Sequence, residues 1–265
     1  MSTIPPSPQL RPHEQRQVAE SFGNDADRYD RARPGYPPAL VQQILDTSPG
    51  RDLLDVGCGT GIAARLFKAA GCRVTGVEPD ERMAELARQT GLTVDVTKFE
   101  DWNPAGRAYD AVVAAQAWHW VDPVAGAAKA ATALRPGGRL AVFWNAMQLP
   151  ADLNEAVAAV YRQALPDQPM LHRGMPGPEV YQRGCVSAGE AVQKAGGFGE
   201  PEQWRFDWSR DYARAEWLDQ VPTFGGFSLL PADKQEEILA GIGEAVGDGF
   251  TMAYATVAMS AVRIV

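Results

Sequence analysis

A short glycine-rich turn carries the most chemical information in this chain. Residues 55–61 read Asp-Val-Gly-Cys-Gly-Thr-Gly and follow an apolar, strand-like pair. Three glycines at alternate positions indicate a backbone that bends sharply and approaches a large partner closely. Glu78 lies 21 residues past Gly57, at the end of the next apolar run. A strand, a glycine turn, a helix and a second strand ending in a carboxylate are typical of the nucleoside-binding half of an α/β sheet.

The spacing of the glycines separates the possible nucleoside ligands. A dinucleotide-binding dehydrogenase needs glycines at positions one, three and six of the turn, and the sixth position counted from Gly57 is Ile62. A phosphate-binding loop needs Lys followed by Ser or Thr after its glycines, and no such pair follows Gly61. The turn therefore favours a nucleoside without a pyrophosphate and disfavours a nicotinamide dehydrogenase.

The motifs resemble those of the class I S-adenosylmethionine-dependent methyltransferases. The similarity covers roughly residues 20–150, and beyond residue 150 it is mainly architectural. Its small-molecule, methyltransferase type 11-like branch is the part of the family that the chain resembles. The motifs that carry the resemblance are Leu-Leu-Asp-Val-Gly-Cys-Gly-Thr-Gly at 53–61, Glu78, Asp110, Leu-Arg-Pro-Gly-Gly at 134–138, Phe-Glu-Asp-Trp at 99–102, Gln-Ala-Trp-His-Trp at 116–120, and the segment from Tyr29 to Pro37.

The resemblance implies a role for each residue around the turn. The Asp55 carboxylate can reach the ammonium of S-adenosylmethionine directly or through water, and Glu78 can accept hydrogen bonds from both ribose hydroxyls. Simple alternatives are that Asp55 caps the following helix, that Glu78 is a solvated carboxylate, and that Phe99 only packs in the core. The cofactor-binding residues that the resemblance implies are Asp55, Gly57, Cys58, Gly59, Gly61, Glu78, Pro79, Phe99, Glu100, Gln116, Ala117, Tyr29 and Arg33.

Methyl transfer needs a shaped pocket and at most one general base. His119 follows the fourth strand at its carboxyl end and is the candidate base, and the alternative is that it is structural and that Trp118 and Trp120 only pack. Trp118, Trp120 and Tyr36 are candidates for the substrate pocket, and Arg33 suits the cofactor carboxylate or an acidic acceptor. No metal site is expected. The aromatic C-terminal part supplies either further pocket walls or plain core: Trp204, Trp208, Trp217, Phe224 and Phe227.

Hydrophobic periodicity predicts the elements that position these residues. Strands separated by helices imply parallel pairing through right-handed crossovers. The predicted fold class is therefore α/β. The resemblance further implies a Rossmann-like seven-stranded sheet, mostly parallel with an antiparallel last strand, with helices on both faces and with N-terminal and inserted lid segments. The expected strands are 52–56, 73–77, 92–96, 110–115, 139–144, 202–209 and 251–263, and the expected helices are 13–22, 38–46, 61–70, 80–89, 123–134, 152–164, 187–195, 214–221 and 231–245.

The same patterns divide the chain into three parts. Residues 1–37 form an N-terminal arm and lid, residues 38–150 form the S-adenosylmethionine-binding core, and residues 151–265 shape the substrate site and complete the same sheet. Within the last part, residues 166–189 are rich in Pro and Gly without periodicity, which predicts an irregular insertion or mobile lid.

Composition sets the outer limits on function. The 265 residues carry a formal net charge of −8, which argues against a nucleic-acid partner. Three cysteines without close pairing suit a reducing compartment. No segment has the length and hydropathy of a membrane span, and the N-terminus does not resemble a signal peptide. We expect a cytoplasmic protein, monomeric or homodimeric, without a membrane partner.

The resulting expectation is an S-adenosylmethionine-dependent methyltransferase that acts on a small-molecule acceptor by O-, N- or carboxyl-methylation. The alternative is a catalytically silent protein that binds S-adenosylmethionine as a sensor or a partner subunit.

Overall fold

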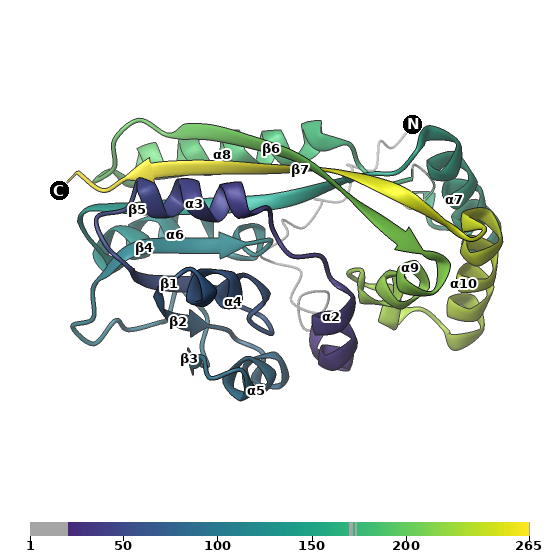
Figure 1. Cartoon of the computed structure of the whole chain (residues 1–265), viewed down its shortest axis with the longest axis horizontal. Coiled ribbons are helices and arrows are strands. Elements are labelled where there is room, and N and C mark those ends of the chain that lie inside the picture. The colour runs from purple at the N-terminus through teal and green to yellow at the C-terminus, as the bar shows by residue number, and fades with distance from the viewer. Residues whose placement is uncertain (1–20, 170–171, 173, 265) are drawn as a thin grey trace, which may run out of the picture.

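The computed structural model describes residues 21–169, 172 and 174–264. Seven strands form one twisted sheet in the order β3-β2-β1-β4-β5-β7-β6 (Figure 1). The first five pair in parallel, and β7 runs antiparallel to both of its neighbours. The predicted mostly parallel, Rossmann-like sheet with an antiparallel last strand is confirmed. The strands are β1 (Asp52–Val56), β2 (Arg73–Val77), β3 (Thr93–Asp95), β4 (Tyr109–Ala115), β5 (Leu134–Gln148), β6 (Glu202–Ala213) and β7 (Gly249–Val262).

Helices cover both faces of this sheet because successive strand residues point to opposite sides. Leu53 packs with α3 and α4 on one face, whereas Leu54 packs with α6 and α8 on the other. In Figure 1, α3 and α4 lie in front of the sheet and α6 and α8 lie behind it. The helices that cover the two faces are α3 (Pro38–Asp46), α4 (Ile62–Ala69), α5 (Glu81–Gln89), α6 (Pro123–Ala133) and α8 (Pro178–Ala195).

A second hydrophobic core lies beyond the carboxyl ends of β1 and β4. It joins α7 (Ala151–Ala164), α9 (Arg214–Gln220) and α10 (Ala232–Val246) to the adjoining ends of β6 and β7 (Figure 1). We call residues 151–164 and 214–246 the C-terminal lobe. Trp217 and Ile238 are buried at its centre. The lobe therefore stands at the end of the sheet where α/β proteins bind ligands.

The expected irregular insertion at 166–189 is wrong for its second half. Helix α8 begins at Pro178 rather than at residue 187, with Pro178 at its first helical position and Gly177 before it. Proline suits that position because its missing N–H is not needed there. Cys185, Ala188 and Val192 are buried against the sheet, so this segment is core and not a lid. The Pro-Gly signal at 176–178 marked the start of a helix.

The segment before α3 crosses from the sheet to the C-terminal lobe. A short helix, α2 (Ala26–Ala32), follows a 3-10 turn at Phe22–Asp25. Arg28 and Arg31 both pair with Asp219 on α9, with nitrogen–oxygen distances of 3.2 and 2.9 Å. The predicted arm and most of the helix predicted at 13–22 lie outside the described residues. In the part of the chain that the structure describes, no helix is long and apolar enough to cross a membrane.

Candidate active site

The glycine turn has the backbone geometry that its sequence predicts. Gly57, Gly59 and Gly61 all have positive φ, at 64°, 55° and 88°. The amide groups of Gly57 and Cys58 both donate to the Val77 carbonyl, at 2.8 and 3.2 Å, which ties the turn to β2. A Cβ on Gly57 would lie 2.5 Å from the Cβ of Ala117. Only glycine meets both demands at position 57, a left-handed conformation and a close approach to the turn after β4.

Asp55, one residue before the end of β1, carries a fully buried carboxylate. Its side chain is 0% exposed, and neither oxygen has a hydrogen-bond partner among the described residues. Burial, with a smaller contribution from the negative charge of Glu78, raises the pKa of Asp55 to about 8, and the backbone amide of Ala64 in the first turn of α4 opposes this rise without reaching an ordinary hydrogen bond. A buried and unsatisfied carboxylate is costly unless a cation or a donor joins it. The position therefore suits the ammonium group of a ligand.

Glu78 is buried directly after β2 and links the glycine turn to the start of α5. Its Oε2 accepts from the Gly59 amide at 2.9 Å, and its Oε1 accepts from the Asp80 amide at 3.0 Å. Burial raises the pKa of Glu78 to about 7, although these two hydrogen bonds oppose the rise. Each oxygen keeps a second lone pair, which is available to accept a hydrogen bond from a ribose hydroxyl. The ribose contact itself stays a prediction. Pro79 stands between Glu78 and Asp80, the N-cap of α5.

The residues predicted to line the adenine are well packed. Phe99 is 3% exposed, and its ring centroid lies 6.0 Å from that of Trp102 and 6.3 Å from that of Trp118. Glu100 Oε1 accepts from the Asp122 amide at 2.7 Å. This contact ties the loop after β3 to the start of α6. Their contact with adenine stays a prediction.

One small cavity brings together four of the predicted site residues. Tyr29, Arg33, Tyr36 and Gln116 line it, and Gln116 is held at a φ of +56° with its Nε2 donating to the Asn145 carbonyl. The cavity measures about 20 Å³, room for little more than one water molecule. The cavity as it stands is therefore too small for a nucleoside. The remaining lining residues are Pro34, Ile62, Asn145, Met147 and Tyr254.

Arg33 is held between two aromatic rings. Its guanidinium carbon lies 5.0 Å from the centre of the Tyr29 ring and 4.9 Å from that of Phe224. One terminal nitrogen donates to the Thr223 carbonyl, and the buried Nε has no partner among the described residues. The side chain therefore joins the segment after α2 to the C-terminal lobe. Most of its five N–H donors remain without an acceptor among the described residues.

His119 does not line the cavity beside Gln116, and one of its ring nitrogens already accepts a hydrogen bond. Trp144 Nε1 donates to its Nδ1 at 3.1 Å, and indole is a donor only. Burial lowers the pKa of His119 to about 4, so the ring is neutral and its hydrogen is on Nε2. Its role as a general base stays a prediction, and Nδ1 serves as the base only if the bond from Trp144 breaks.

The two flanking tryptophans differ from each other. Trp118 is 2% exposed in the core beneath α6, whereas Trp120 is partly exposed with its ring 6.1 Å from that of Phe22. Neither lines the cavity beside Gln116. Their place in a substrate pocket stays a prediction.

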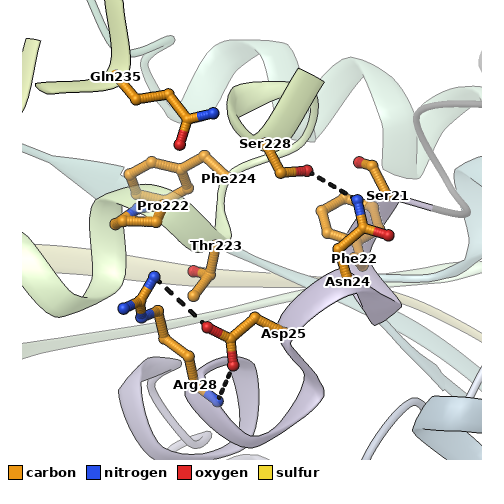
Figure 2. A pocket seen from close by; sticks show the side chains of 10 residues that line it. All are labelled: Ser21, Phe22, Asn24, Asp25, Arg28, Pro222, Thr223, Phe224, Ser228 and Gln235. Atoms are coloured by element: carbon orange, nitrogen blue, oxygen red, sulfur yellow. Dashed lines mark hydrogen bonds and ion pairs between the residues drawn. The ribbon is translucent and has the colours of Figure 1, made fainter. Parts of the chain in front are cut away.

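A second cavity of about 70 Å³ lies at the seam between residues 21–28 and 222–235 (Figure 2). Figure 2 shows Asn24 reaching across the seam to Ser228, a hydrogen bond of 3.2 Å. Thr223 and Phe224 separate this side from Arg33. The contacts across the seam are polar and partly exposed, which suits a surface that opens.

Sequence reasoning missed Asn145 and Tyr254 among the residues that line the cavity. Asn145 is a single amide within the apolar run of β5, and a polar residue in such a run indicates a specific contact. Its Nδ2 donates to the Gly35 carbonyl at 2.9 Å, and its Oδ1 accepts from Thr256 at 2.7 Å. Met147 and Tyr254 reach the cavity through the long pairing of β5 with β7, which no local motif marks. Across the described residues, no cluster of three or more His, Cys, Asp or Glu is arranged to hold a metal ion.

Comparison with known proteins identifies the family. The family model of the methyltransferase domain matches residues 29–172, which are more than half of the chain. The chain belongs to this family, and the class I S-adenosylmethionine-dependent methyltransferase predicted from the motifs is confirmed at the level of family and fold.

Individual relatives agree with this assignment. An uncharacterized methyltransferase of Mycobacterium tuberculosis is 38% identical over 132 residues, which is 49% of this chain and 54% of the relative. A ubiquinone biosynthesis O-methyltransferase of Methylocella silvestris is 38% identical over 34% of this chain and 38% of its own length. The chain thus spans about half or less of these relatives. A putative type II methyltransferase structure from Anaeromyxobacter dehalogenans superimposes with a TM-score of 0.63 at 25% identity, covering 88% of this chain and 98% of that one.

Proposed function

We propose that this chain transfers a methyl group from S-adenosylmethionine to a small-molecule acceptor. The unpartnered, buried carboxylate of Asp55 beside the glycine turn is the observation that supports this most directly. The cofactor carries an ammonium group that would satisfy it. The ubiquinone biosynthesis relative favours a small molecule as the acceptor.

The residues present fit this cofactor. Asp55 would hold the ammonium, Glu78 the ribose, and Phe99 with Glu100 the adenine, while Gly57 and Gly59 leave the backbone free of side chains. When bound, the cofactor supplies an electrophilic methyl carbon on a sulfonium. The chain itself would then act by position, holding an acceptor in line with that carbon and excluding water.

We infer a division of labour along the chain that follows this chemistry. Residues 38–150 would form the cofactor core, and residues 151–265 would shape the acceptor site. Residues 1–37 would act as arm and lid. The small volume of the cavity and the polar seam support a cover that opens at Tyr29–Tyr36.

Isothermal titration with S-adenosylhomocysteine, the demethylated product, tests the proposal. We expect binding at roughly micromolar Kd and at least a tenfold loss in Glu78→Ala, with Glu236→Ala on the exposed face of α10 as the matched control. Circular dichroism checks that both variants fold. Absence of binding to the wild type would contradict the proposal. Tight binding without methylation of any acceptor in a broad panel would favour the catalytically silent alternative.

A further inference from the structure

Arg33 differs from the other arginines around α2 in having no acidic partner. Arg28 and Arg31 share Asp219, and Arg65 pairs with Asp30 at 2.7 Å. Within the described residues, no ion pair includes Arg33, and its one hydrogen bond is to the Thr223 carbonyl. A guanidinium has five N–H donors in a planar fork that matches a carboxylate. Arg33 therefore has donors available for an anion.

The surroundings hold this cation in a fixed place. The rings of Tyr29 and Phe224 lie at 5.0 and 4.9 Å from its guanidinium carbon, and contacts of this kind stabilise a cation that is partly shielded from water. Its Nε is buried without a partner, which favours a ligand that supplies an acceptor. The site is thus built before any ligand arrives.

The position of Arg33 points toward the acceptor side of the site. It lines the cavity with Tyr36, Met147 and Tyr254, whose side chains offer apolar and aromatic surface. Its hydrogen bond and one of its ring contacts are made to Thr223 and Phe224 of the C-terminal lobe. Asp55, by contrast, belongs to the glycine turn of the sheet. A carboxylate at Arg33 would therefore be flanked by the lobe.

We propose that Arg33 binds the carboxylate of the methyl acceptor, so that the substrates are small organic acids whose apolar or aromatic portion lies against Tyr36, Met147 and Tyr254. This inference rests on the proposed methyl transfer. It makes Arg33 a specificity-determining residue and leaves the methylated atom to the acceptor's own chemistry.

Binding to the S-adenosylhomocysteine-saturated protein tests the inference with matched acids and amides. The probes are 4-hydroxybenzoate with 4-hydroxybenzamide, cinnamate with cinnamamide, and hexanoate with hexanamide. We expect acids to raise the melting temperature more than their amides do. Arg33→Met should abolish this preference with at least a tenfold loss of affinity, and Arg33→Lys should retain part of it. Arg205→Met, on the exposed side of β6, is the control.

Two outcomes would overturn the inference. One is a panel in which no acid binds better than its amide, or in which the preference survives in Arg33→Met. The other is that Arg33→Met weakens S-adenosylhomocysteine tenfold while 5′-methylthioadenosine, which lacks the amino-acid part, binds as before. The guanidinium would then serve the cofactor's own carboxylate. Failure of the proposed function is distinct, because the wild type would then not bind S-adenosylhomocysteine at all.

Discussion

The glycine turn and the C-terminal lobe are built on different principles. The turn is a local device in which positive-φ glycines and two buried carboxylates lie within 24 residues of sequence, at 55–78. The lobe assembles aromatic side chains from separate elements. Beside it, Tyr254 of β7 and Met147 of β5 meet only because these two strands pair over ten residue positions. A site formed by one continuous segment is specific for one ligand. A site formed by residues from distant segments can change its ligand by substitution without a change of fold.

The two regions also differ in charge. The turn has the acidic groups Asp55 and Glu78, both with raised pKa, and the face of the lobe meets the cation of Arg33. We infer that the cofactor is recognised mainly through the carboxylates of Asp55 and Glu78, and the acceptor through the positive charge of Arg33. Substitutions in the turn, at its boundary with the lobe and at the seam test this difference between the two regions.

The largest effect is expected from Gly57→Ala. The new Cβ would clash with Ala117 at 2.5 Å, and the residue would be strained at a φ of 64°. We expect a loss of cofactor affinity on the order of a hundredfold, about 3 kcal/mol, measured by titration calorimetry. Gly71→Ala has a similar φ of 88° but open space around it, so it should bind normally. Equal behaviour of the two variants would show that the approach to Ala117 is unimportant.

A pH series should separate the turn from the rest of the protein. The pKa values of Asp55 and Glu78 are raised to about 8 and about 7, so the ligand-free folded state holds protons that the unfolded state has lost. Between pH 6 and 8.5 the stability of the free protein should therefore fall, by at most about 1.4 kcal/mol per pH unit for each proton. Cofactor binding, which uses the charged forms, should strengthen over the same range.

Melting curves with and without S-adenosylhomocysteine measure both slopes. In Asp55→Asn the fall in stability of the free protein should be shallower, because the group no longer titrates. An unchanged slope in that variant would contradict the assignment of the titration to the turn.

Asn145→Ala tests the boundary between the two regions. The amide is 2% exposed and joins the Gly35 carbonyl to Thr256 of β7. Its removal leaves buried polar groups unsatisfied and should lower the free energy of unfolding by about 2 kcal/mol. Chemical denaturation measures this. Gln148→Ala, at the end of the same strand, should cost far less, and similar losses in both would show that the bridge contributes little.

The smallest effect is expected at the seam. Asp219→Asn removes the acid shared by Arg28 and Arg31, a partly exposed pair whose contribution we place at about 1 kcal/mol or less. The hydrogen bond from Arg31, together with the charges of Arg31 and Arg28, holds the pKa of Asp219 below its usual value although burial opposes this. We expect little change in melting temperature and faster proteolysis near residues 21–36. Proteolysis identical to that of the wild type would contradict a cover that opens here.

The sequence predicted the sheet and the cofactor side well because both depend on short-range signals. Short apolar runs marked β1 and β4, which are buried almost throughout, and the glycine spacing marked the turn. The start of α8 was misplaced because Pro178 was taken as a breaker, although proline also begins helices. Tyr254 and Met147 were not predicted as neighbours of Arg33, since nothing local encodes the register of β5 with β7.

His119 shows the same limit on the scale of one side chain. Its position after β4 indicated a base, whereas its hydrogen bond from Trp144 depends on the packing of β5 beside it. The protonation of a histidine follows from such partners, which the sequence does not reveal.

Amide hydrogen exchange with and without S-adenosylhomocysteine tests the division of the site most directly. On binding, we expect slower exchange at residues 55–62, 76–81 and 98–102, and unchanged exchange in α9 and α10 of the C-terminal lobe. Protection confined to the lobe, or no protection at the glycine turn, would contradict this division.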